Sequence, residues 1–424
     1  MTTLPYLTND LPGIGGRIKQ HVEDFQVDEI PLYEACGQGT HAYFRIRKRG
    51  IPTPTAVTRL ARYMGVSPSH IGVAGMKDAQ ALTTQMLSLE HCDERKLLHY
   101  HDPQMQVLDV SRHGNKLRPG HLAGNRFTIR VRGVGTAQLP AAQAVLDVLR
   151  QRGVPNFFGA QRFGARTDTA ALGEALVKGD LKEFVARYLG RAQPTDPPDC
   201  KAARDAFDAG FLDRAVKRWP RHYTSERHAL LAYKRSDGRP GPVIAAVDKR
   251  MKRLYVSAFQ SELFNEVLAR RMATLDRVLK GDLAQKFDTG GIFTVDDEAV
   301  EQPRADRFEI SPTGPIIGYR CHLADGEPGV IERQIVESHH VDLEAFRRFD
   351  SKGTRRALRF AIRDLAVRAD SDPLSEFIEL SFVLPSGCYA TVLLHEVMKC
   401  DAPDAPADEV DAPADETVAP TEEE

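Results

Sequence analysis

The sequence lacks the features that would assign it to a secreted, membrane or disulfide-rich class. Its 424 residues contain six cysteines, and no two of them are spaced as C-x-x-C. Scattered cysteines of this kind predict free thiols in a reducing compartment. No run of about 18 apolar residues occurs, so no transmembrane helix is predicted. The N-terminus has neither the basic start nor the apolar core of a signal peptide, and we therefore expect a cytoplasmic protein.

Several catalytic motifs are also absent, and each absence excludes a class of chemistry. The sequence has no G-x-x-x-x-G-K-[ST] phosphate-binding loop and no G-x-S-x-G nucleophile turn. His395-Glu396 is followed by Lys399 where a zinc protease motif requires a second histidine. The close histidine pairs are not accompanied by a C-x-x-C pair, so we predict no metal site.

The acidic residues are concentrated at the C-terminal end of the sequence, and the rest of the chain carries a net positive charge. The net charge of −2 becomes +8 when the ten acidic residues after Lys399 are removed, because no Lys or Arg follows that residue. A basic body suits a polyanion as partner, although an excess of this size also occurs in proteins that bind no nucleic acid. Residues 400–424 consist mainly of Ala, Pro, Asp and Glu without any aromatic residue, which predicts a disordered acidic tail.

Periodicity predicts a mixture of helices and strands. Residues 53–65 favour a helix that Thr53 would cap and Gly65 would end. Residues 41–49 and 125–133 alternate strictly, which is typical of strands, and each places a row of arginines on one face. Such arginines could contact phosphates, or they could form the solvated face of a half-buried strand.

One carboxylate stands at a junction where it could reach a cleft. Asp78 lies in a short polar break between the apolar residues 71–75 and the strand-like residues 83–90. An aspartate in such a loop can project toward a substrate. It can equally well hydrogen-bond its own backbone as a turn residue, and the spacing alone leaves both readings open.

Seven motifs in order along residues 15 to about 399 decide between these readings. They are K-x-x-x-E-D-F-x-V-x-E at 19–29, A-G-x-K-D-x-x-A-x-T-x-Q at 74–85, G-N-R-F at 124–127, V-P-N-F-F-G-x-Q-R-F-G at 154–164, Q-S-x-L-F-N at 260–265, P-T-G-P at 312–315 and P-S-G-x-Y-A-T at 385–391. Together they resemble the TruD family of pseudouridine synthases. The motif at 74–85 resembles the catalytic motif of that family.

The resemblance implies an α/β fold of α+β type in two domains. A discontinuous pseudouridine-synthase catalytic domain, with a mixed and largely antiparallel sheet, would comprise residues 1–152 and 344–399. An inserted α/β domain specific to TruD would occupy residues 153–343. A helix-rich middle between two strand-rich segments agrees with such an insertion.

The resemblance also assigns residues to the site. Asp78 would be the catalytic residue, and Lys19 would be the cation beside it. Phe25, Asn125, Phe127 and Tyr389 would bind the substrate nucleotide, with Phe127 stacking on the flipped base. Tyr389 departs from the phenylalanine expected there. From the residues alone, Phe25 and Phe127 would be core and Asn125 a turn residue.

Arginines near the motifs are candidates for contact with RNA, since arginine pairs with phosphate and stacks on aromatic rings. The candidates are Arg162, Arg166, Arg355, Arg356 and Arg359. The last three belong to the basic segment 347–363, which is interleaved with Phe346, Phe349 and Phe360 and is also compatible with an ordinary amphipathic surface.

The resulting hypothesis is a tRNA pseudouridine synthase, an isomerase that acts on uridine 13 in the D-arm. The isomerisation oxidises nothing and loses no group, so no cofactor is expected. We expect tRNA as the partner, a monomer, no protein partner and no membrane. Two alternatives remain: a non-catalytic RNA-binding or chaperone protein that uses the same basic cleft, and a hydrolase in which Asp78 works with a second carboxylate.

Overall fold

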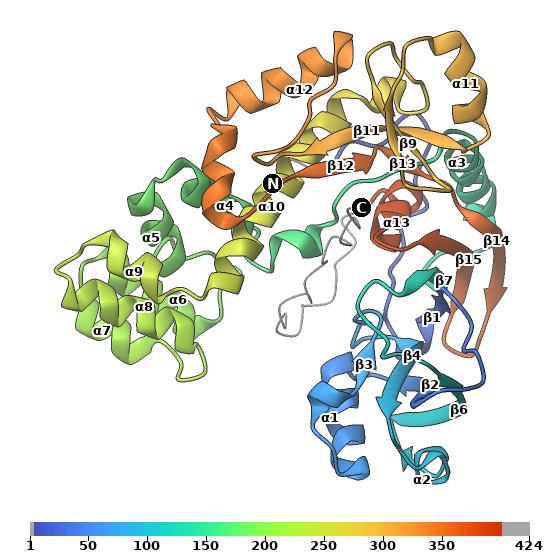
Figure 1. Ribbon diagram of the computed structural model, residues 1–424, viewed down its shortest axis with the longest axis horizontal. Helices are drawn as coiled ribbons and strands as arrows, with labels where there is room; N and C mark the ends of the chain where they lie inside the picture. The colour runs from blue at the N-terminus through green and yellow to red at the C-terminus, as the bar shows by residue number, and fades with distance from the viewer. Residues whose placement is uncertain (1–3, 401–424) are drawn as a thin grey trace. The chain divides into compact units, whose positions relative to one another are not determined.

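The chain folds into two compact units, and the computed structural model describes residues 4–400. We call residues 8–154 and 360–400 the sheet unit, and residues 4–7 and 155–359 the helical unit. Both contain helices and strands, which confirms the predicted α/β fold class (Figure 1). The predicted disordered tail lies outside the described residues, apart from Cys400. None of the described helices combines the length and the apolar character needed to cross a membrane.

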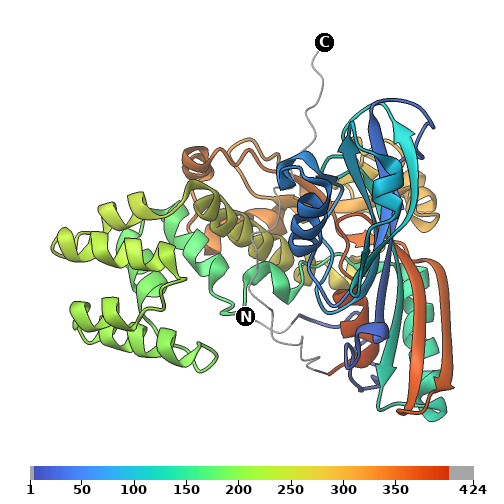
Figure 2. The same cartoon turned by 90° about the horizontal axis from the view of Figure 1, so that it is seen from below.

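The sheet unit is built on a mixed sheet that joins strands from both ends of the chain. The strand order is β14-β15-β7-β1-β4-β2-β6-β5, with β3 paired to β4. Figure 2 shows the red C-terminal strands and the blue and cyan N-terminal strands in this one sheet. The strands are β1 (Phe25–Pro31), β2 (His41–Arg49), β3 (Gly72–Val73), β4 (Leu82–Glu90), β5 (His101–Asp102), β6 (Met105–His113), β7 (Leu122–Arg132), β14 (Arg363–Ser371) and β15 (Glu376–Pro385).

The centre of this sheet sets the positions of the candidate site residues. β1 pairs in parallel with β4 and antiparallel with β7. The strand that follows the Asp78 loop and the strand that carries the G-N-R-F motif therefore flank β1 on its two sides. Glu29 stands opposite Asn125, and Val27 stands opposite Phe127. The alternation predicted for 125–133 is confirmed in β7, where Phe127, Ile129 and Val131 are buried.

The sheet unit also contains four α-helices. They are α1 (Thr53–Met64), α2 (Glu94–Leu98), α3 (Leu139–Arg152) and α13 (Ala390–Met398), with short 3-10 turns at Val22–Asp24, Pro68–His70 and Thr136–Gln138. α3 packs against both α13 and β14. α1 ends at Gly65 in the left-handed conformation (φ 78°), as predicted. Its N-cap is Pro52, so the prediction that Thr53 caps the helix is wrong.

The arginine rows on the sheet are largely paired with carboxylates. Arg45 pairs with Asp109 across β2 and β6, and Arg126 pairs with Asp364 at 2.7 Å. Arg132 is buried between Asp24 and Asp372, at 2.7 and 2.8 Å. These guanidinium groups therefore stabilise the sheet through ion pairs between its strands.

The helical unit has a long central helix, α10 (Lys249–Arg270), which packs against α4, β11 and α12. The other elements are α4 (Thr169–Lys178), α5 (Leu181–Leu189), α6 (Pro198–Asp208), α7 (Leu212–Arg218), α8 (Thr224–Arg235), α9 (Pro240–Ala246), α11 (Glu298–Asp306), α12 (Gly326–Ser338), β9 (Leu283–Lys286), β10 (Ile292–Thr294), β11 (Ile310–Ile316), β12 (Thr354–Ala357) and 3-10 turns at Ala160–Phe163, Met272–Thr274 and Leu343–Phe349. Two short strands, β8 (Val154–Pro155) and β13 (Arg359–Phe360), lie where the chain passes between the units.

The units differ from the predicted domains at one boundary. Residues 344–359 were predicted to belong with the catalytic domain. In the structure they pack within the helical unit, because Phe346 is buried in its core and β12 pairs with β11. The other predicted boundary, at 152/153, lies close to the division at Val154 and Pro155.

Candidate active site

Asp78 lies in the loop between β3 and β4, on the sheet unit. Its side chain is 52% exposed, and its Oδ2 accepts a hydrogen bond from Lys19 Nζ at 2.9 Å. Lys19 itself is mostly buried and has a left-handed backbone (φ 55°), a conformation that is uncommon outside glycine. The pair thus presents a carboxylate to solvent with a cation fixed on one side of it.

A buried lysine in strand β2 holds the Asp78 loop through its backbone. Lys48 is fully buried in β2, and its ammonium donates to three carbonyls: Ile51 at 2.6 Å, Lys77 at 3.3 Å and Asp78 at 2.9 Å. Burial lowers the pKa of Lys48 to about 8, against the opposing attraction of Asp78, and the neighbouring Lys77 lowers it further. Two of these charge-assisted hydrogen bonds fix the loop, and one of them is accepted by the carbonyl of Asp78 itself.

Lys77, the neighbour of Asp78 in sequence, points the opposite way, into the sheet unit. Its ammonium lies 3.0 Å from Glu29 Oε2 and donates to Asn125 Oδ1 at 2.9 Å. Its backbone N–H donates to the hydroxyl of Thr53 at 2.9 Å. These contacts leave Asp78 directed outward, and they tie its loop to β1, β7 and the start of α1.

The predicted aromatic residues Phe25 and Phe127 are in contact with each other and with Lys19, the partner of Asp78. The rings of Phe25 and Phe127 meet edge to face at 6.2 Å, and Phe127 stacks on Phe382 at 5.4 Å. The Lys19 ammonium lies 4.5 Å from the centre of the Phe25 ring. Phe127 is only 7% exposed, so in this conformation both phenylalanines also belong to the core.

Asn125 and Tyr389 flank the same end of the sheet. Asn125 is half-buried on β7 and is oriented by Lys77. Tyr389 is half-buried at the N-cap of α13. The turn before Tyr389 is joined to β7 by a hydrogen bond from Ser386 N to Ala123 O at 3.1 Å. The predicted substrate-binding residues of the sheet unit therefore follow the paired strands β1, β7 and β15: Phe25 is opposite Ile129, Phe127 is opposite Val27 and Phe382, and Asn125 is opposite Glu29 and Leu384, with Tyr389 just beyond β15.

Two of the five arginines predicted to contact RNA are buried instead. Arg355 is 6% exposed and pairs with Glu332 at 2.7 Å. Arg359 is 1% exposed, donates to the Ala305 carbonyl at 2.7 Å and lies over the Phe308 ring. Both guanidinium groups stabilise the helical unit and are enclosed in this conformation, which does not favour contact with a phosphate. Their contact with RNA stays a prediction.

The other three arginines are half-buried in the helical unit, and each has partners there. Arg162 donates to Ser261 at 3.2 Å, Arg166 pairs with Asp168 at 2.8 Å, and Arg356 donates to Asn156 at 2.6 Å. Arg356 also stacks over Phe158 at 4.3 Å. Their contact with RNA stays a prediction.

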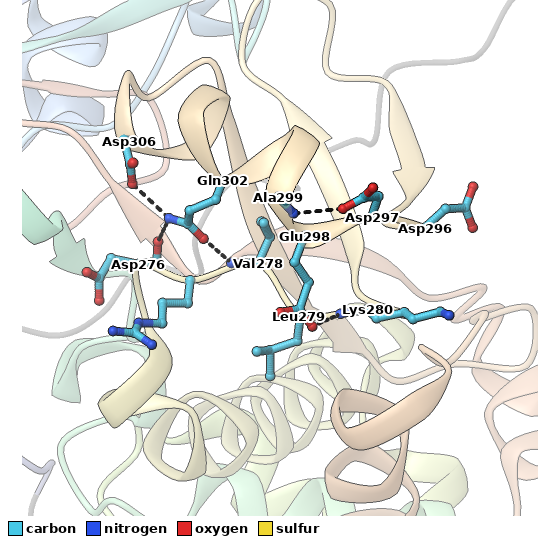
Figure 3. A pocket seen from close by; sticks show the side chains of 11 residues that line it. Asp276, Val278, Leu279, Lys280, Asp296, Asp297, Glu298, Ala299, Gln302 and Asp306 are labelled. Atoms are coloured by element: carbon cyan, nitrogen blue, oxygen red, sulfur yellow. Dashed lines mark hydrogen bonds between the residues drawn. The ribbon is translucent and has the colours of Figure 1, made fainter.

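One large pocket in the helical unit is unsuited to an RNA substrate. It has a volume of about 970 Å³ beside α11. Figure 3 shows several carboxylates around it: Asp276, Asp296, Asp297, Glu298 and Asp306. A wall of this charge repels phosphates. Within residues 4–400, no group of three or more His, Cys, Asp or Glu side chains is arranged to hold a metal ion.

Comparison with known proteins agrees with this arrangement. The family model described as tRNA pseudouridine synthase D (TruD) matches residues 2–397. The chain belongs to the TruD family. It is 42% identical over 398 residues to the tRNA pseudouridine synthase D of Geotalea daltonii, which covers 93% of this chain and 99% of the relative. It is 43% identical to that of Geobacter metallireducens, over 94% of this chain and 98% of the relative.

A solved TruD structure shows the same fold. The crystal structure of the putative tRNA pseudouridine synthase D from Methanosarcina mazei superposes with a TM-score of 0.81 at 30% identity. The match covers 93% of this chain and 96% of that one. Membership of the TruD family makes the chain a pseudouridine synthase, an isomerase that modifies RNA.

The sequence did not indicate that Lys48 and Thr53 support Asp78. Both hold its loop, together with Glu29 of the 19–29 motif, and Thr53 also donates to Gln85 at 2.8 Å. Thr53 was interpreted as a helix cap because it precedes a proline. One available signal for Lys48 was its position in β2. It follows Phe44 and Ile46 at a spacing of two residues, which places all three side chains on the buried face of the strand.

The two roles of Phe127 can be separated with a matched pair of substitutions. Phe127→Leu keeps an apolar side chain but removes the flat ring, so we expect turnover to fall while tRNA affinity stays within about twofold, since backbone contacts dominate affinity. Phe382→Leu, in the ring stacked on Phe127, serves as control for packing. Turnover and melting temperature are measured for both variants. Equal loss of turnover in the two would assign Phe127 to the core alone.

Proposed function

We propose that the protein converts uridine 13 in the D-arm of tRNA to pseudouridine, with Asp78 as the catalytic carboxylate. The observation that carries the proposal is the solvent-exposed Asp78, paired with Lys19 and set on a loop whose backbone Lys48 anchors. The relatives named tRNA pseudouridine synthase D support tRNA as the substrate class. The proposed catalytic domain is the sheet unit, and the helical unit is the proposed insertion domain.

The reaction breaks the N1–C1′ bond of the target uridine and forms a C5–C1′ bond. The uracil turns between these steps, N1 gains a proton and C5 loses one, so atoms and electrons balance. Base flipping would bring the nucleotide to Asp78, and Phe25, Phe127, Asn125 and Tyr389 are proposed to hold it. Asp78 would act as nucleophile or base while Lys19 stabilises its charge.

The arrangement disfavours the hydrolase alternative. Glycoside hydrolysis normally uses two carboxylates, one of which activates a water. Glu29, the carboxylate held by Lys77 behind the loop, is 1% exposed and therefore closed to water. The remaining alternative is a non-catalytic RNA-binding protein. It gives no reason for a carboxylate to be directed outward, where it would repel the phosphates of the RNA.

The decisive experiment incubates the purified protein with unmodified tRNA and measures pseudouridine and free uracil. Pseudouridine at position 13 without free uracil is expected, and a tRNA with cytidine at that position should give none. Free uracil would indicate the hydrolase, and unchanged RNA that is nevertheless bound would indicate the non-catalytic alternative.

Activity is expected to survive metal chelation, because the isomerisation needs no electron carrier and the proposed groups are all side chains. The measurement is the initial rate with EDTA on tRNA folded beforehand, compared with the rate in excess Mg²⁺. A loss of rate that zinc restores while the tRNA stays folded would overturn this prediction.

A further inference from the structure

A small hollow in the helical unit gathers positive charge. It has a volume of about 440 Å³ and lies around the end of α7 and the turn into α8. Four basic residues and one acidic residue contribute to its wall; the charged residues are Lys217, Arg218, Arg221, Arg227 and Asp199. α7 packs between α6 and α8, and these three helices lie side by side (Figure 1).

The exposed cations at this hollow are not neutralised by the protein. Lys217, Arg218 and Arg221 are exposed, and none of them forms an ion pair with any residue of the described chain. Lys201 pairs with Asp205 at 3.0 Å and Lys234 pairs with Asp213, whereas the exposed Arg214 and Arg235 form no ion pair within the described residues. What distinguishes the hollow is that three such unpaired cations lie at one place, around the end of α7.

The wall of the hollow is held in place by contacts that leave those charges outside. Trp219 is 1% exposed, and the Arg204 guanidinium lies 5.0 Å from its ring. Arg227 donates to the carbonyls of Val216 at 2.9 Å and Trp219 at 2.7 Å, which fixes the turn that carries Lys217, Arg218 and Arg221. The three exposed cations therefore project from an ordered segment.

Stabilisation of the α7 dipole explains only part of this cluster. Lys217 and Arg218 occupy the last turn of α7, where cations are favourable. Arg221 lies beyond the helix end, and a helix of seven residues gains little from a third cation there. A ligand that carries several negative charges accounts for all three.

We propose that this hollow binds backbone phosphates of the RNA substrate, an inference that rests on the proposed function. Long exposed cations suit an extended polyanion, which they bind by releasing its counterions. A site for a small phosphate would instead use buried, converging donors. Bases are not expected to stack here, because Trp219 is covered by the protein.

The test compares two triple substitutions that remove the same charge. Lys217→Gln, Arg218→Gln and Arg221→Gln together should weaken tRNA binding at least about tenfold at low salt. The slope of log affinity against log salt should fall by about 2 to 3. The control combines Arg187→Gln, Lys201→Gln and Lys234→Gln, which removes the same number of paired cations from α5, α6 and α8. At saturating tRNA the single-turnover rate of the first variant should equal that of wild type.

Affinity and slope unchanged in the first variant, or an equal loss in the control, would overturn the inference. Inorganic phosphate is the second probe. If phosphate raises the melting temperature of the wild type at concentrations that leave that of the variant unchanged, the hollow is a site for a small anion and the inference is overturned. Melting temperatures verify folding, and Arg221→Gln alone replaces the triple variant if that unfolds. Failure of wild type to form pseudouridine, with the binding difference intact, would sink the proposed function but not this RNA contact.

Discussion

Asp78→Asn is expected to abolish pseudouridine formation while leaving tRNA binding nearly unchanged. The substitution keeps the shape of the side chain but removes the negative charge and the nucleophile. The backbone of residue 78 stays anchored, because the hydrogen bond from Lys48 is accepted by its carbonyl and not by its carboxylate. Affinity is set by cations that contact phosphates, and removal of one anion can only preserve or slightly raise it.

A matched control is available on the same unit. Asp364 is 59% exposed and pairs with Arg126 at 2.7 Å, much as Asp78 is 52% exposed and pairs with Lys19 at 2.9 Å. Asp364→Asn should therefore retain wild-type conversion. The measurement is single-turnover conversion of tRNA beside a binding isotherm for each variant. Conversion by Asp78→Asn within about tenfold of wild type, a barrier change of about 1.4 kcal/mol, would show that Asp78 is a turn residue.

The sequence predicted local elements better than their partners. The alternation of β7 and the end of α1 at Gly65 follow from short-range patterns, and both are confirmed. The pairing of β7 with β15 joins residues about 250 positions apart, and alternation says nothing about which strands meet. The compact units divide the chain differently from the predicted domains at residues 344–359 for the same reason, since only tertiary packing shows that β12 pairs with β11.

The arginines near the motifs show that one sequence pattern can serve two purposes. Arginines interleaved with phenylalanines suit RNA, but they also suit a core in which guanidinium groups stack on rings. Arg359 over Phe308, with its hydrogen bond to Ala305, is the second case. Only the accessible surface separates the two, and a sequence does not contain it.

The Lys48 ammonium is costly to bury, which makes its position informative. A lysine enclosed by protein loses its hydration, and this lowers its pKa to about 8. The unfolded chain keeps its proton up to a higher pH than the folded chain, so this residue makes stability rise as the pH rises above about 8. Lys48 therefore opposes folding while it is charged. Its two hydrogen bonds to the Asp78 loop suggest that this lysine is kept for function and not for stability.

Lys48→Met should accordingly separate activity from stability. Methionine fills similar space without the charge or the donors, so the melting temperature should stay near that of wild type or rise. Loss of the contacts to the Lys77 and Asp78 carbonyls frees the loop, and a displacement of about 1 Å at the carboxylate can lower the single-turnover rate on the order of 100-fold. tRNA affinity should stay within about twofold.

Lys116→Met is the control, because Lys116 also donates to a carbonyl, that of Ser69 at 2.6 Å. This substitution should leave the single-turnover rate unchanged. A folded Lys48→Met protein that converts tRNA within about threefold of wild type would mean that the loop holds Asp78 in place without this lysine.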